Sequence, residues 1–334
     1  MSNTRRITQI TSLSRDAVIA VLSGTHPVDV LHDSIESRLR NALGDFKFSS
    51  EVDTERLVMV YLRHLREKGD PLGLMLCEVD HMIEALYSTI TIMEVGPQSF
   101  SKHRDAIGLG TLWHDIYAVT IKSEVPIGEP LSLSDYLVRN WGHEKEKHAN
   151  LPLIKELAEE TIGRGELYDL VVAAVDFSSG SHKMSSSEWA STQWVHPLRI
   201  ADNLATQRTS GDRHKYLVYN WACDIAQGFD NQEKVAQRIL KRESFCKRLA
   251  RGEILSLVAE QVFERKGINL IEDFPGLLER IETAGGFKPV LLNPITAYTT
   301  AMQVKYNEEL NRLFPSFAAV GYNRASYTLA MQGA

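Results

Sequence analysis

Amphipathic segments of helical length run through most of this chain, and this pattern limits the fold more than any other feature of the sequence. Apolar residues recur three and four positions apart within them, as in residues 72–93 and 151–162, which is the spacing of one face of an α-helix. Glycine, proline and capping residues separate the segments. Alternating β-branched runs are scarce and no Asn-Gly turn occurs, so strands are not indicated. The sequence therefore predicts an all-α fold.

The predicted helices fall into three parts of a chain that is long enough to bury a sizeable core. We expect a helical preface over residues 1–50, a core over 51–215 and a C-terminal helical extension over 216–334. Asp53 or Thr54 can cap the first helix of the core. The expected helices span 17–22, 28–43, 55–68, 72–93, 102–119, 135–141, 151–162, 166–177, 188–207, 215–227, 232–249, 253–266, 277–283 and 295–313.

Charge and cysteine content narrow the class of protein. The net charge of −6 argues against bulk affinity for nucleic acid. Cys77, Cys223 and Cys246 are widely spaced and form no Cys-x-x-Cys pair, which is typical of reduced thiols in a cytoplasmic protein. No apolar run approaches the roughly 20 residues of a membrane span, and the first residues lack the apolar stretch of a secretory signal. We therefore expect a cytoplasmic protein without a membrane partner.

One segment, residues 105–118, combines apolar helix-like character with an adjacent histidine and aspartate, His114 and Asp115. Burying ionisable groups costs free energy unless something compensates, and a divalent cation compensates an imidazole beside a carboxylate. Two further residues of the same types, His81 and Asp202, lie in helix-like segments before and after it. Taken alone, His81 is also compatible with a core-edge histidine bonded to a backbone carbonyl, and a His-Asp pair is common by chance. Together they predict a metal site.

This constellation resembles the HD superfamily of metal-dependent phosphohydrolases. The family pattern has a histidine on one helix, a His-Asp doublet on the next, and an aspartate on a later helix. His81, His114 with Asp115, and Asp202 occupy these places, and the resemblance covers roughly residues 75–215. It implies an HD-like helical core with additional N- and C-terminal helices, and hydrolysis of a phosphoester of a nucleotide or cyclic nucleotide. The alternative is a non-catalytic binding or regulatory protein on an HD-like scaffold.

The same resemblance implies a divalent ion as cofactor, with His114 and Asp115 at the catalytic centre. Two imidazoles and two carboxylates leave two positions open on an octahedral ion. The ion would activate a water molecule and polarise a phosphoryl oxygen. This donor set does not select strongly among Mn²⁺, Fe²⁺, Mg²⁺, Co²⁺, Ni²⁺ and Zn²⁺. The sequence leaves the identity of the ion open, and it is compatible with a homo-oligomer.

A second ion would need further ligands. Dinuclear members of the superfamily carry extra histidines between the doublet and the last aspartate, where this chain has His148 and His182. Solvated histidines on loops are the alternative. The tandem His-His of many dinuclear members is absent because Lys183 follows His182. The Gly-Tyr-Pro motif and the Glu-Asp pair of two other branches are also absent, so no specific substrate is assigned.

Cations near the site would stabilise the charge of a substrate phosphate. Each candidate is also compatible with an ordinary surface position, but we expect at least one to face the metal. A separate basic stretch around His64 is interpreted as a solvated helix face. The candidates for the phosphate are Lys122, Lys183, Arg199 and Arg208.

Overall fold

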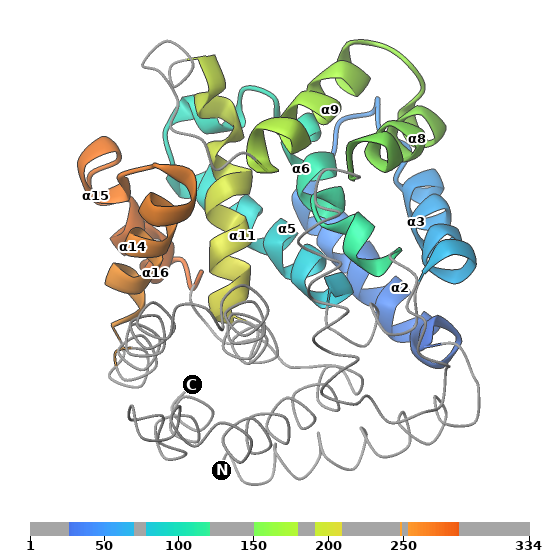
Figure 1. Ribbon diagram of the computed structural model, residues 1–334, viewed down its shortest axis with the longest axis horizontal. Coiled ribbons are helices and arrows are strands. Elements are labelled where there is room, and N and C mark those ends of the chain that lie inside the picture. The colour runs from blue at the N-terminus through green and yellow to red at the C-terminus, as the bar shows by residue number, and fades with distance from the viewer. Residues whose placement is uncertain are drawn as a thin grey trace, which may run out of the picture.

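A computed structural model describes residues 27–69, 78–120, 150–179, 191–208, 248 and 253–286 of the chain. All the regular secondary structure in these ranges is helical, with no strand among them (Figure 1). The predicted all-α fold is therefore confirmed. No helix in the same ranges has both the length and the apolar character needed to cross a membrane.

The helical periodicity predicted several boundaries to within a few residues. Asp53 caps α3 as expected, with its carboxylate accepting the Arg56 backbone N–H at 3.1 Å. The α-helices are α2 (Pro27–Phe46), α3 (Thr54–Lys68), α5 (Glu78–Val95), α6 (Arg104–Trp113), α8 (Asn150–Ile162), α9 (Glu166–Ser179), α11 (His196–Arg208), α14 (Ile254–Lys266), α15 (Leu270–Asp273) and α16 (Leu277–Thr283). Single 3₁₀ turns occur at η1 (Gln98–Ser101), η2 (Ile116–Val119) and η4 (Gln193–Val195).

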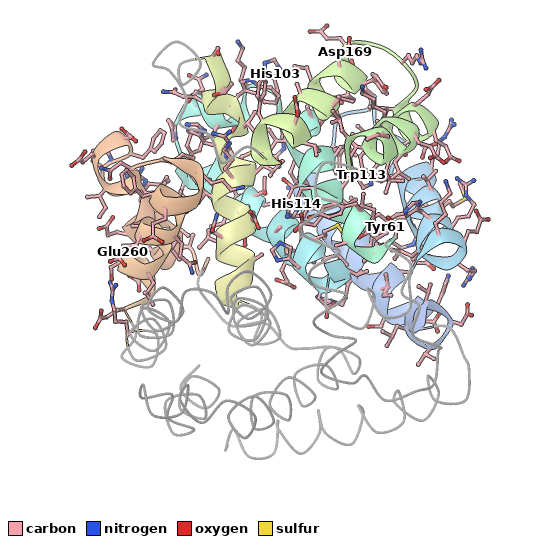
Figure 2. All side chains as sticks on the ribbon, in the orientation of Figure 1. Tyr61, His103, Trp113, His114, Asp169 and Glu260 are labelled. Atoms are coloured by element: carbon pink, nitrogen blue, oxygen red, sulfur yellow. The ribbon has the colours of Figure 1, made fainter. Side chains whose placement is uncertain are left out.

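Helix α5 lies at the centre of the fold and packs against α11, α6 and α2 (Figure 1). Helices α8 and α9 pack on each other and cover the side of α6 and α3, while α14 and α16 pack on α11 and α5. One hydrophobic core extends between these helices, from Val28 in α2 to Ile281 in α16. Trp113 and Tyr61 lie within it, whereas Asp169 and Glu260 lie at the edge of the molecule (Figure 2). Burial of this core fixes the mutual positions of α5, α6 and α11.

The helix predicted over 102–119 is interrupted in the structure. Helix α6 ends at Trp113, Asp115 has φ −119° and ψ 19°, and the chain then forms the 3₁₀ turn η2. The helix predicted over 188–207 is likewise interrupted, because residues 191–192 are helical, the 3₁₀ turn η4 follows, and α11 begins at His196. Hydrophobic periodicity does not distinguish one continuous helix from two helical segments separated by a break, because the apolar residues keep the same spacing across the break.

The interpretation of His64 as part of a solvated face was wrong. Only 4% of this residue is exposed, because it lies on the apolar face of α3, and its burial lowers its pKa to about 4. Its neighbours Arg63, Arg66 and Lys68 do reach solvent, and they pair with acidic residues of α8 and α2.

Several predicted features lie outside the described residues. These include the three cysteines and the helices expected over 17–22, 135–141, 215–227 and 295–313. Of the helix expected over 232–249, only residue 248 is described. The division of the chain into a preface, a core and an extension stays a prediction.

Candidate metal centre

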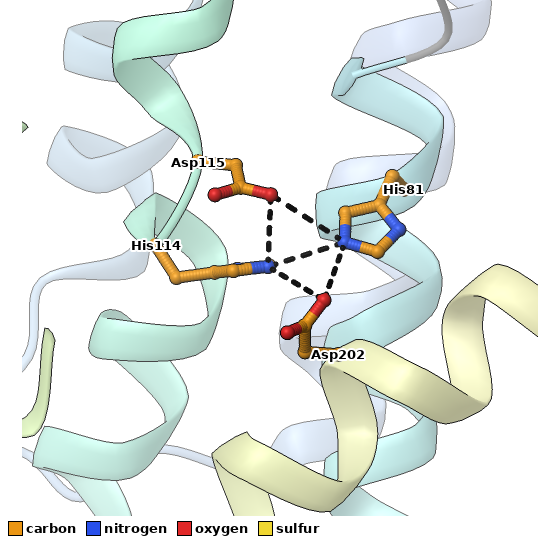
Figure 3. Close-up of side chains that lie close together, drawn as sticks. All are labelled: His81, His114, Asp115 and Asp202. Carbon is orange, nitrogen blue, oxygen red and sulfur yellow. Dashed lines mark hydrogen bonds and ion pairs between the residues drawn. The ribbon is translucent and has the colours of Figure 1, made fainter. Parts of the chain in front are cut away.

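Four side chains, from α5, α11 and the residues that follow α6, converge at one point (Figure 3). His81 projects from α5, and His114 and Asp115 lie directly after α6. Asp202 projects from α11. These are the four residues singled out from the sequence, and one ligand atom of each lies within 4.8 Å of the ligand atoms of the others.

The distances within this cluster match the spacing of ligands around one metal ion. His81 Nε2 lies 3.2 Å from His114 Nε2 and 3.3 Å from Asp202 Oδ1. Asp115 Oδ2 lies 3.5 Å from His114 Nε2 and 3.8 Å from His81 Nε2. Donors about 2.1 Å from one divalent ion lie about 3.0–4.2 Å apart, and these separations, with 3.8 Å between His114 Nε2 and Asp202 Oδ1, fall in that range. The four residues could therefore hold one metal ion.

The end of α6 explains how two consecutive residues reach the same point. Successive side chains on a regular helix diverge by about 100° around its axis, so His114 and Asp115 would otherwise face different directions. Asp115 leaves the helical conformation, with φ −119° and ψ 19°, while His114 remains helical. This change of backbone direction brings both side chains into the cluster, as Figure 3 shows.

Hydrogen bonding fixes which nitrogen of His114 faces the cluster. His114 Nδ1 lies 2.7 Å from the carbonyl oxygen of Thr111, one turn earlier in α6. A carbonyl can only accept, so Nδ1 carries the proton and donates it. In the neutral imidazole, Nε2 therefore presents its lone pair to His81, Asp115 and Asp202, as a metal ligand must.

The charges in the cluster are strongly coupled. Burial by itself would lower the pKa of His114, but the neighbouring carboxylates of Asp115 and Asp202 outweigh it and raise that pKa. Burial would likewise raise the pKa of Asp202, but hydrogen bonds from His114 and His81 and the charge of Lys266 hold it well below its usual range. A positive charge at this point, whether protons or a metal ion, is thus strongly stabilised.

Two other acidic residues near His81 in the sequence pair with an arginine of α2. Asp80 and Glu84 are both buried on α5 and pair with Arg38 of α2, with Arg38 Nη2 lying 3.1 Å from Glu84 Oε1. This buried ion group attaches α5 to α2 and compensates the two carboxylates. His81, which lies between them in the sequence, belongs to the cluster.

A lysine that the sequence did not indicate also borders the cluster. Lys266 is the last residue of α14, and its Nζ lies 3.6 Å from Asp202 Oδ2. The sequence contains no signal for this role, since a lysine at the end of an amphipathic helix is ordinary. Only the packing of α14 on α11 brings it to the site.

The predicted phosphate-binding residues have different outcomes. Arg199 is fully buried, and its Nε donates to the carbonyl oxygen of Phe177 at 2.9 Å. Burial lowers its pKa to about 10, so it is still a cation at neutral pH. Arg208 ends α11, and its side chain lies outside the described residues. Lys122, Lys183, His148 and His182 also lie outside them.

No protein-family model, curated protein or solved structure matches this chain. The geometry of the cluster therefore carries the functional argument.

Proposed function

We propose that this chain is a divalent-metal-dependent phosphohydrolase with an HD-like helical core. The observation that carries the proposal is the convergence of two imidazoles and two carboxylates from α5, α6 and α11 at the spacing of metal ligands. The order of these residues along the chain, a histidine, a His-Asp doublet and a later aspartate, is the pattern of the HD superfamily. His81, His114, Asp115 and Asp202 would hold the ion.

A divalent ion at this position would supply Lewis acidity toward a phosphoryl oxygen and toward water. The residues of the chain hold the ion and shield it from solvent. His114 is held by Thr111 with its Nε2 lone pair directed inward, so it needs no reorientation to act as a ligand. Its side chain and that of His81 are 5% and 6% exposed, so these donors are shielded from competing solvent.

The charge of the site favours an anionic substrate. Asp115 and Asp202 contribute two negative charges, and Lys266 beside them contributes one positive charge. With a divalent ion and neutral imidazoles, the site would have a net positive charge. A phosphoester is attracted to such a site, whereas a neutral or cationic substrate is not. We propose a nucleotide or cyclic nucleotide as the substrate class, in line with the HD pattern.

The number of ions can be tested at the two histidines that would supply a second site. Replacing His148 or His182 by Ala should halve the metal content if they are ligands, while the first ion stays in place. Unchanged metal content with a raised Michaelis constant would assign them to substrate binding instead. Unchanged metal content and unchanged kinetics in both variants would show that one ion and four ligands are the whole site.

The function itself is tested by metal analysis and a substrate screen. Protein purified without chelator should contain a stoichiometric divalent metal. With added Mn²⁺, it should hydrolyse at least one member of a panel of nucleotides and cyclic nucleotides. His114→Ala and Asp115→Ala should lose both properties, because each removes a ligand that no other residue of the described ranges duplicates.

The matched control for this experiment is Asp105→Asn. Asp105 lies at the first turn of the same helix, where its carboxylate accepts the Ser49 backbone N–H at 3.3 Å. This variant should keep both metal and turnover. Stoichiometric metal in both doublet variants would refute the metal centre. Metal binding without turnover on any substrate would favour the non-catalytic regulatory protein.

A further inference from the structure

The C-terminal part of the chain reaches the metal centre through one residue, Lys266. Helix α14 packs on α11 and ends at Lys266, where Gly267 adopts φ 69° and the chain turns back. A left-handed conformation of this kind favours glycine, so the helix end is well defined in the sequence. The side chain of Lys266 is 11% exposed and reaches residues of α9 and α11.

The ammonium of Lys266 contacts two elements at once. Its Nζ donates to the carbonyl oxygen of Ser178, near the end of α9, at 2.7 Å. It also lies 3.6 Å from Asp202 Oδ2. The other oxygen of this carboxylate, Oδ1, lies 3.3 Å from His81 Nε2. The Asp202 carboxylate is therefore held between the metal-ligand cluster on one side and Lys266 on the other.

The contact with Ser178 has an ordinary structural explanation. The last carbonyls of a helix lack partners within the helix, and cations stabilise that end. In α9 the carbonyl of Phe177 accepts from Arg199, and the carbonyl of Ser178 accepts from Lys266. Capping of α9 accounts for this hydrogen bond, but it does not account for the placement of the same ammonium beside Asp202 Oδ2. The two contacts can be separated experimentally.

We propose that Lys266 is a positioning residue of the metal centre, which holds Asp202 so that the carboxylate offers only Oδ1 to the ion. This inference rests on the proposed function. A carboxylate can bind a metal through one oxygen or through both, and the second mode occupies two coordination positions. The attraction of Oδ2 to the ammonium opposes that second mode.

The number of Asp202 oxygens that bind the ion decides how many of its coordination positions remain open. Four single-atom donors leave two positions on an octahedral ion, enough for water and a substrate oxygen. If Asp202 bound through both oxygens, only one position would remain. Lys266 would thus keep the second position open.

A control within the same C-terminal unit is available at Arg280 in α16. Its Nε donates to the carbonyl oxygen of Val95 at 2.9 Å, at the far end of α5 from His81. Arg280→Met should loosen the docking of this unit without touching the metal ligands. It therefore reports what weaker docking alone does to the site.

The number of water molecules on bound Mn²⁺ tests the proposal directly, because the inner-sphere relaxation of water protons is proportional to that number. We would titrate the full-length protein with Mn²⁺ and measure water-proton relaxivity. Lys266→Met should lower the inner-sphere contribution about twofold, as two open positions become one. Lys266→Gln should do the same, although its amide can still donate to the Ser178 carbonyl. Lys266→Arg should keep the wild-type value, as should Arg280→Met.

The relaxivities of the variants separate a role of Lys266 from a general effect of helix docking. Wild-type relaxivity in both the Met and the Gln variants would overturn the role of Lys266, while the metal centre would stand. A similar fall in Arg280→Met would also overturn it, because docking would then be the cause. If Lys266→Met does not fold, the Gln variant decides, since it retains a donor for α9. Failure of the wild-type protein to bind Mn²⁺ would instead refute the proposed function and this inference together.

Discussion

The metal centre predicts a specific pattern of thermal stability in the Asp115→Asn variant. Asparagine has nearly the same shape as aspartate, and the Asp115 side chain is 22% exposed, so the substitution creates no cavity. It removes one negative charge from the cluster. It also removes the anionic oxygen that lies 3.5 Å from His114 Nε2. Metal binding and metal-free stability should respond differently.

Metal-free stability should change little, because two electrostatic effects oppose each other. The variant loses attraction between Asp115 and a protonated His114, which is favoured by the raised pKa of His114. It also loses repulsion between Asp115 and Asp202, whose ligand oxygens lie within 4.8 Å. The two effects have opposite signs and act over similar separations, so they largely cancel.

Stabilisation by metal should disappear in the variant. Binding to the folded state alone adds about 2.7 kcal/mol when the free ion is at 100 times its dissociation constant. An unfolding entropy of about 2.1 cal/mol/K per residue gives about 0.7 kcal/mol/K for 334 residues. The wild-type Tm should therefore rise by about 4 °C with Mn²⁺ relative to EDTA, and the Tm of Asp115→Asn should not change.

Differential scanning calorimetry with and without Mn²⁺ measures this difference. The control, Asp105→Asn, lies on the same helix outside the cluster and should keep the wild-type shift. A full shift in Asp115→Asn would show that its carboxylate is not a ligand. No shift in any of the proteins would show that the cluster binds protons and not metal.

Two further predictions concern packing and pH. Gly108→Ala should destabilise the protein by about 1–3 kcal/mol in urea unfolding, because the new Cβ would lie 2.4 Å from the buried ring of Phe46. Gly44→Ala in α2 should instead stabilise it by about 0.5–1 kcal/mol, since nothing lies within 4 Å and alanine favours the helix; the opposite order would contradict the packing of α2 on α6. The pKa of His64 is about 4 in the folded protein and about 6.5 in the unfolded chain. Between these values the unfolded chain takes up a proton that the folded protein does not. The contribution of His64 to stability is therefore full above pH 6.5 and falls as the pH drops toward 4. His64 should contribute about 2 kcal/mol to the loss between pH 7 and pH 5, so the loss in His64→Gln should be smaller by that amount. An equal loss in that variant would assign the acid sensitivity to other groups such as buried His196, whose pKa is lowered to about 3.

The sequence by itself determined the fold class and the four residues of the cluster. Helix α3 was predictable because Asp53 caps it and its apolar residues follow helical spacing, and α16 was predictable over Leu277–Thr283 for the same reason of spacing. His81, His114, Asp115 and Asp202 could be selected because ionisable residues in apolar helical segments need a compensating partner. These are properties of local segments, and local sequence encodes them.

Tertiary structure decided how those residues meet and what surrounds them. The turn at Asp115 that brings it beside His114 depends on how the end of α6 packs, because the apolar pattern continues across it. The burial of His64 depends on neighbouring helices, although its own neighbours in sequence are basic. Lys266 reaches Asp202 only because α14 packs on α11. Periodicity predicts which face of a helix is buried, but not which helix covers it, because that choice depends on the packing of segments far apart in the chain.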